Sequence, residues 1–247
     1  MIKFFRKIRQ NLLSERKTGK YFKYALGEVI LVVVGILIAL QINNWNDSRK
    51  ENKIKNNYYN RLLVDLEADK AYANRYISRI DSSLAVYDKY RKSYEKPNLS
   101  LTEILTNLGK NNVYTLDLQY QTSTIETLIN TGDLQILDSR IIDLVTKYNG
   151  QKNQTELLSR DNKRDATDLL KNFALRGGVM TVFNNFPNQP ELFKNLNFED
   201  RIPDVIIAFE AFVVWKREID RTNVKMLTEN NKTADSIIEI INLELKK

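Results

Sequence analysis

The chain has 247 residues, no cysteine, no histidine and a formal net charge of +7 at pH 7. The missing residue types exclude disulfides, thiol chemistry, His-assisted nucleophiles and the usual zinc sites. Gly and Pro are sparse, with 8 and 4 residues, and helix formers are abundant, so the composition predicts an all-α protein.

The whole net charge lies in the first 24 residues, which hold eight Lys or Arg residues and one acid. The other 30 basic and 30 acidic residues cancel. This distribution is typical of the cytoplasmic flank of a membrane helix, so we expect no nucleic-acid partner. Within residues 1–20, apolar side chains recur at helical spacing opposite basic ones, which predicts an interfacial segment facing anionic lipids. An ordinary flank without a further role is the alternative.

An apolar segment follows from Ala25 to Ile42 and contains 12 Leu, Ile or Val residues. At about −0.3 to −0.6 kcal/mol each, they favour membrane insertion by roughly 4–7 kcal/mol. As a helix the segment rises about 27 Å, and aromatic residues on both sides extend it towards the ~30 Å hydrocarbon core. We therefore expect residues 21–45 to be one uncleaved transmembrane helix. The positive-inside rule then places the N-terminus in the cytoplasm and residues 46–247 in the periplasm, anchored in the inner membrane.

Polar and small residues inside this segment predict a helix contact in the membrane. Glu28 lies about one turn inside the apolar run, where an acid is costly enough to indicate a function. Gly35 and Ala39 have the spacing that lets two helices approach closely, and Gln41 adds a polar group. We expect these four residues to contact a partner helix. For Glu28, a passive acid reaching the interface and ion or proton coupling are the alternatives.

Three pieces of the N-terminal region carry a family resemblance: FRKIRQ (5–10), KYFKYALGE (20–28) and VVVGILIALQINNWN (32–46). A looser fourth piece is YQTSTIETLINTGDLQIL (120–137), with Thr131 where Ser is usual. In these pieces the chain resembles an uncharacterised family of membrane-anchored proteins that is abundant in Bacteroidota. The resemblance implies one transmembrane helix followed by a helical domain. It brings no catalytic residue, because the family has no known function.

Beyond the anchor, apolar periodicity predicts three long helices in an antiparallel bundle. The first covers residues 52–94 and runs on from the anchor. Its apolar positions, at steps of three and four, are Tyr59, Leu62, Leu66, Ala73, Tyr76, Ile80, Tyr87, Tyr90 and Tyr94. The second is expected from about Ser139 to Leu175, closed by Gly177-Gly178, and the third from Pro203 or Asp204 to the end.

Two short helices are predicted between the first and second long ones. Ser100 with Glu103 forms a capping-box pattern, and that helix should stop near Gly109. The same pattern recurs at residues 123–126, and its helix should end at Gly132, where glycine supplies a left-handed C-cap.

Three acids, Asp161, Asp165 and Asp168, lie at helical spacing and are the only candidate metal cluster that the pattern offers. The interleaved Lys163 and Arg164 favour a solvated charged face instead, so we expect no metal and no cofactor. The sequence has no P-loop, GxGxxG, GxSxG or EF-hand pattern. Together these observations predict that the protein is not an enzyme.

Aromatic residues gather in two places. Seven of the 12 Tyr lie in the first long helix, where we expect half-buried core positions with hydroxyls reaching water; sugar stacking or partner contacts are the alternative. A Gly-Gly and two prolines accompany Phe183, Phe186 and Phe193 in the connector RGGVMTVFNNFPNQPELF. This loop either packs on the bundle as a satellite cluster, the favoured interpretation, or contacts a partner or ligand.

The sequence therefore predicts a membrane-anchored, non-enzymatic accessory or scaffold protein. Its partners would be the bilayer and either another protein or further copies of the chain. A periplasmic ligand-binding or sensing module, with a pocket near the Phe-rich connector, is the alternative. A carboxylate-dependent enzyme is a third hypothesis that no residue constellation supports.

Overall fold

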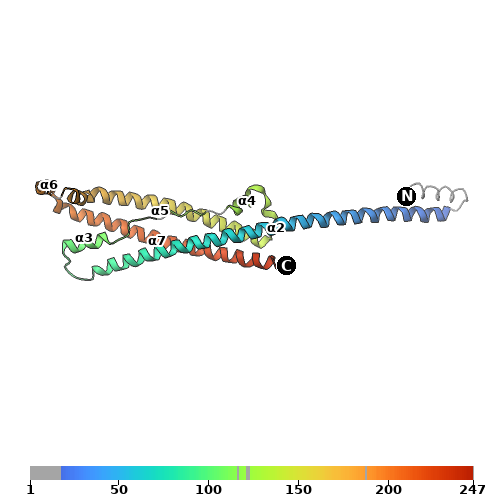
Figure 1. Ribbon diagram of the computed structural model, residues 1–247, viewed down its shortest axis with the longest axis horizontal. Helices are drawn as coiled ribbons and strands as arrows, with labels where there is room; N and C mark the ends of the chain where they lie inside the picture. The colour runs from blue at the N-terminus through green and yellow to red at the C-terminus, as the bar shows by residue number, and fades with distance from the viewer. Residues whose placement is uncertain (1–17, 116, 121–122, 187, 247) are drawn as a thin grey trace. The chain divides into compact units, whose positions relative to one another are not determined.

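The computed structural model describes residues 18–246, without residues 116, 121–122 and 187. The described residues form helices and no strand, which confirms the all-α architecture. In chain order the elements are α2 (Thr18–Ser93), α3 (Leu101–Gly109), α4 (Thr124–Thr131), the 3₁₀ turn η1 (Asp133–Ile136), α5 (Ser139–Asn185), α6 (Pro190–Asn195) and α7 (Phe198–Glu244) (Figure 1). Most of the expected interfacial segment, residues 1–20, lies outside the described residues.

The chain divides into two compact units, residues 1–57 and residues 58–247. The described part of the first unit is the N-terminal part of α2, and the rest of that helix belongs to the second unit. One unbroken helix thus contains both the apolar segment and the first helix of the folded domain, as the periodicity predicts.

The second unit is built on three long helices whose buried side chains form three hydrophobic clusters. Helix α7 runs antiparallel to α2 and α5, and these two run in the same direction (Figure 1). Each helix buries residues at alternating steps of three and four, the spacing of a coiled-coil seam. On α7 the seam consists of Phe209, Val213, Lys216, Asp220, Asn223, Leu227, Asn230, Ala234, Ile237 and Ile241, all of them buried. On α5 its buried members include Ile141, Val145, Tyr148, Lys152, Thr155, Ser159 and Ala166.

Because α2 and α5 are parallel, the chain must return along the bundle between them. It does so after α3, in the segment between α3 and α4, here called the return segment. The side chain of Leu118 is fully buried there. The backbone N–H of Leu118 donates to Ser159 Oγ at 3.1 Å, and that of Gln119 donates to Tyr72 Oη at 2.8 Å. Tyr120 N donates to Glu156 Oε1 at 2.6 Å. Side chains of the helices thus accept hydrogen bonds from backbone N–H groups of this extended segment, which in a sheet would bond to a neighbouring strand.

The tyrosines of α2 join the helix to the other elements. Tyr58, Tyr59 and Tyr90 are buried, and most of the others are half-buried, which agrees with core positions. The sequence predicted that their hydroxyls reach water, but in the structure most of these hydroxyls bond to other elements. Tertiary hydrogen bonds connect Tyr58 to Asp133, Tyr59 to Asp138 N, Tyr72 to Gln119 N, Tyr76 to Asp117 O, Tyr87 to Arg217 and Tyr90 to Glu210.

The first capping box forms as predicted, and the second does not. Ser100 Oγ accepts from Glu103 N at 3.3 Å, and the Glu103 side chain accepts from Ser100 N at 2.9 Å. Ser123 makes no side-chain cap at α4. The carboxylate of Asp65 on α2 accepts from Thr124 N at 3.0 Å instead, so a tertiary contact caps this helix. Gly132 ends α4 in the left-handed conformation, at φ 77°, as predicted.

Two predicted helix boundaries are wrong. Helix α5 continues through Gly177 to Asn185. Gly177 is buried on the core side, with Phe173 and Val205 side-chain atoms 3.6–3.8 Å from where its Cβ would lie, so this glycine serves helix packing rather than a helix end. Helix α7 begins at Phe198, and Pro203 lies inside its second turn. Pro203 has no N–H, so the helix loses one backbone hydrogen bond there.

Candidate functional site

The core seam of the domain is polar in its middle. Four seam positions of α7 hold Lys216, Asp220, Asn223 and Asn230, although each is at most 6% exposed. Buried polar groups are costly unless they are hydrogen-bonded, so each needs a partner across the bundle. Asn230 is bonded in one polar layer, and Lys216 and Asp220 are bonded in a second. Asn223 belongs to neither layer, and its Oδ1 has no hydrogen-bond partner among the described residues.

The first layer joins all three long helices and the return segment. Tyr148 Oη on α5 donates to Asp69 Oδ2 on α2 at 2.7 Å. Asn230 Nδ2 on α7 donates to Tyr120 Oη at 3.0 Å and to Thr155 Oγ1 on α5 at 3.1 Å. Burial raises the pKa of Tyr120 to about 12, and burial with the nearby Asp69 charge also raises the pKa of Tyr148, so both phenols remain neutral, Tyr148 as a donor and Tyr120 as an acceptor. These two sets of buried hydrogen bonds help to fix the helix register.

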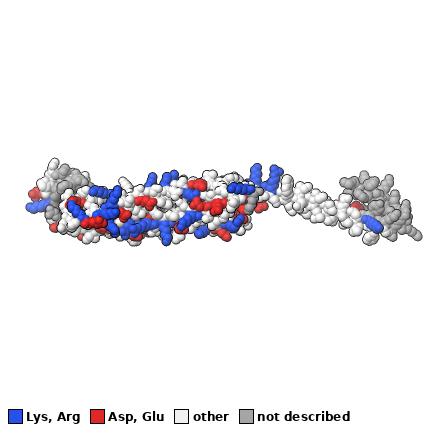
Figure 2. All heavy atoms as spheres, turned by 90° about the horizontal axis from the view of Figure 1, so that it is seen from below, with Lys and Arg blue, Asp and Glu red and all other residues white. Residues whose placement is uncertain are grey.

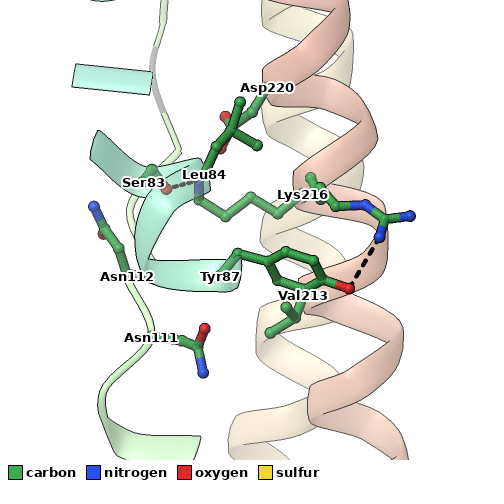
Figure 3. A pocket seen from close by; sticks show the side chains of 9 residues that line it. Ser83, Leu84, Tyr87, Asn111, Asn112, Val213, Lys216 and Asp220 are labelled. Carbon is green, nitrogen blue, oxygen red and sulfur yellow. Dashed lines mark hydrogen bonds and ion pairs between the residues drawn. The ribbon is translucent and has the colours of Figure 1, made fainter. Parts of the chain in front are cut away.

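The second layer is a charged pair on α7 that is hydrogen-bonded to α2. The Lys216 side chain extends from α7 to Ser83 on α2, where its Nζ donates to Ser83 Oγ at 2.9 Å (Figure 3). The same ammonium forms an ion pair with Asp220 one turn along α7, and the two side chains are only 8% and 9% exposed. Burial raises the pKa of Asp220 above its ordinary value, against the opposite effects of Lys216 and Ser83.

An open groove of about 590 Å³ lies over this charged pair. Its lining residues are Ser78, Arg79, Ile80, Ser82 and Ser83 of α2, Asn112 and Tyr114 of the return segment, and Lys216 and Asp220 of α7. A smaller cavity of about 20 Å³ adjoins it beside Tyr87, Asn111 and Val213 (Figure 3). That volume admits about one water molecule, whereas the groove has the size of a small-ligand site.

The pairing of Ser83 with Lys216 has the composition of a Ser–Lys nucleophile pair, but its geometry does not suit acyl transfer. The Lys216 Nζ donates to both Ser83 Oγ and the Asp220 carboxylate, whereas a general base has to accept the proton of the serine. Ser83 lies inside α2, where the neighbouring backbone N–H groups form helical hydrogen bonds and provide no oxyanion hole.

The four residues expected to contact a helix in the membrane all lie on α2. Gly35, Ala39 and Gln41 are exposed, and a Cβ added at Gly35 would meet open space. At about 100° per residue, Glu28, Gly35 and Ala39 fall within about 40° of one another around the helix. Gln41 lies about 140° from Glu28, so one partner helix does not meet all four.

The Phe-rich connector forms the end of α5, the turn after it and α6. Phe186 is 50% exposed, and the side chains of Phe183 and Phe193 lie outside the described residues. The groove described above lies elsewhere, between α2, α7 and residues 112–114.

The acidic triplet on α5 belongs to a solvated charged face. Asp161 and Asp165 flank Arg164 at 3.5 and 3.9 Å, and Asp168 pairs with Lys171 at 3.0 Å. All three acids are well exposed. Across the described part of the chain, no group of three or more acids is arranged to hold a metal ion.

Sequence reasoning missed the residues beneath the groove, although a signal for them exists. The apolar series of α2 steps by three and four but has gaps at Asp69 and Ser83, which are the α2 members of the two polar layers. On α7, Lys216 and Asp220 continue the series of Phe209 and Val213. A polar residue at the seam position of an otherwise regular helix indicates a buried polar contact.

Comparison with known proteins adds a family match over part of the chain. Residues 28–91, about a quarter of the sequence, match the model of a family of unknown function (DUF6090). No curated protein and no solved structure matches the chain. The match begins at Glu28 and includes Arg79 and Ser83 but ends before α3, so Lys216 and Asp220 lie outside it. In the part that it covers, the chain is similar to this family of unknown function.

Proposed function

We propose that the chain is a membrane-anchored, non-enzymatic accessory protein, whose N-terminal helix lies in the bilayer and whose helical domain acts by binding. One observation carries this proposal. The N-terminal part of α2 has a mean hydropathy of 2.5 over its most apolar 18 residues, and none of this window is buried. A soluble protein would bury so large an apolar surface, whereas a lipid bilayer accommodates it. Figure 2 shows the stretch as almost free of charged residues, in contrast to the mixed charges of the domain.

The charge distribution supports a specific topology. The eight basic residues before position 25 favour a cytoplasmic N-terminus in the inner membrane and a periplasmic domain. The resemblance of the first 47 residues to a Bacteroidota family of membrane-anchored proteins agrees with this placement.

The anchor and the domain both offer surfaces for a protein partner or a further copy. Glu28, Gly35 and Ala39 share one face of the membrane helix, and small and polar residues promote helix association in lipid. On α7, a stripe of exposed apolar residues at steps of three and four lies opposite the core seam. The stripe consists of Ile207, Ala211, Val214 and Trp215.

The topology is tested with single cysteines, since the natural chain contains none and each introduced thiol is the sole reporter. A membrane-impermeant maleimide is added to cells whose outer membrane has been permeabilised. We expect Asn52→Cys to be labelled and Gly19→Cys to be labelled only after lysis. The reverse pattern would overturn the orientation, and recovery of the protein in the soluble fraction would overturn the anchoring.

The accessory role is tested by photo-crosslinking in the native membrane. A photoreactive amino acid at Ile207 or Trp215 should capture one defined protein, while the same amino acid at the exposed Lys225 should not. Equal capture at all three positions, or none at any, would count against partner binding through α7.

A periplasmic ligand-binding or sensing module is the second candidate function. The groove over Lys216 and Asp220 supports it, because its volume suits a small molecule and its floor is charged.

A further inference from the structure

The groove between α2, residues 112–114 and α7 has a lining that favours one class of ligand. We propose that it binds a small organic anion that carries a carboxylate or phosphate group on a ring. This inference goes beyond the accessory role and does not depend on it, since every residue of the groove belongs to the unit of residues 58–247.

The charges that line the groove leave one positive charge uncompensated. Lys216 and Asp220 neutralise each other at the floor. Arg79 lies at the rim, and among the described residues it has no acid within ion-pair distance. Its guanidinium lies 5.9 Å from the centroid of the half-buried Tyr76 ring, a cation–π contact that restrains it beside the groove. An arginine fork of this kind matches the planar geometry of a carboxylate or phosphate.

Besides the serine hydroxyls, of which Ser82 Oγ already donates to Ser78 O, the groove is lined by N–H donors. Asn112 Oδ1 accepts from Tyr114 N at 2.9 Å, which leaves the Asn112 amide N–H groups as donors. Lys216 uses two of its three N–H groups, on Ser83 and Asp220. Together with Arg79, these donors favour a ligand that is rich in hydrogen-bond acceptors. A cation would find the only carboxylate of the lining already paired with Lys216.

Apolar surface in the groove is the reason for proposing that the ligand carries a ring. This surface comes from the Tyr114 side chain, which is 78% exposed at one edge, because Ile80 in the α2 wall is buried in the core. A large aromatic side chain left exposed beside a polar groove provides a stacking surface for a flat ligand. The small cavity below, of about 20 Å³, holds about one water molecule and not part of the ring.

The test uses four probes with the same aromatic body and different charge: phenyl phosphate, benzoate, the neutral benzamide and the cationic benzamidine. Each is titrated against the full-length protein in nonionic detergent, with binding followed by ligand-observed NMR. We expect at least one of the anions to bind and the neutral and cationic analogues to bind at least tenfold more weakly. Binding of only one anion would support the proposal and identify the group that the groove prefers.

The residue test compares two exposed arginines one turn apart on α2. Arg79→Gln should weaken anion binding about tenfold, which corresponds to about 1.4 kcal/mol, whereas Arg75→Gln outside the groove should leave it within twofold. Neither side chain is buried, so both variants should fold. Equal loss in both variants, equal binding of benzamide or benzamidine, or no binding of either anion at millimolar concentration would overturn the proposal. None of these outcomes bears on membrane anchoring or on the α7 stripe.

Discussion

The buried pair of Lys216 and Asp220 makes a strong prediction about stability. Replacing Lys216 with Met keeps the length and apolar stem of the side chain but leaves the Asp220 carboxylate, only 9% exposed, without its cation. Removing one partner of a buried ion pair costs about 3–5 kcal/mol, because the other charge stays buried and uncompensated. For a folded unit of this size, 1 kcal/mol lowers Tm by about 2–4 °C, so we expect Tm to fall by roughly 6–20 °C.

The double variant Lys216→Met/Asp220→Leu separates the cost of an unpaired charge from that of lost packing. Exchanging both members of a buried pair for apolar residues is often neutral or stabilising, so the double variant should recover most of the loss. The surface pair Asp168–Lys171, at 3.0 Å and with 64% and 68% exposure, is the matched control. Lys171→Met should cost less than about 1 kcal/mol.

Thermal melts in detergent, followed by circular dichroism at 222 nm, give the Tm of four full-length proteins. These are the natural protein, Lys216→Met, Lys216→Met/Asp220→Leu and Lys171→Met. The reasoning is refuted if Lys216→Met melts within 2–3 °C of Lys171→Met, a gap of about 1 kcal/mol. It is equally refuted if the double variant is less stable than the single one, because the cost would then come from packing and not from the buried charge.

Three further predictions concern the same domain. Burial raises the pKa of Asp220 above 3.8, so the folded state binds the Asp220 proton more tightly than the unfolded state does. Protonated Asp220 therefore stabilises the fold fully at low pH, and this stabilisation is lost as the pH rises from 3.8 through the raised pKa. The Tm of the natural protein relative to the double variant should fall across that window. Tyr148→Phe removes the 2.7 Å hydrogen bond to a buried carboxylate and should cost about 1.5–3 kcal/mol, whereas Tyr94→Phe should cost little; equal losses in denaturant unfolding would contradict the first polar layer. Asp65→Ala should cost about 0.5–2 kcal/mol and Ser123→Ala almost nothing, and the opposite order would restore Ser123 as the cap of α4.

Features that depend on neighbours within one or two turns were predictable from the sequence. The capping box of Ser100 with Glu103 and the left-handed Gly132 form as their patterns indicate. The apolar segment and the steps of three and four along α2 likewise predict one continuous helix. In each case the residues that produce the structure lie side by side in the sequence.

Features that depend on the opposite side of the bundle were decided only by the tertiary structure. The cap of α4 comes from Asp65, 59 residues away, because the fold brings that carboxylate to the helix start. Gly177 continues a helix instead of ending it, because α7 packs against it. The polar side chain of Lys216 is visible in the sequence, but its burial and its contact with Ser83, 133 residues away, are not. Local patterns determine where a helix forms and which face is buried, whereas the partners of a buried charge, and the groove above it, depend on which distant segment packs opposite.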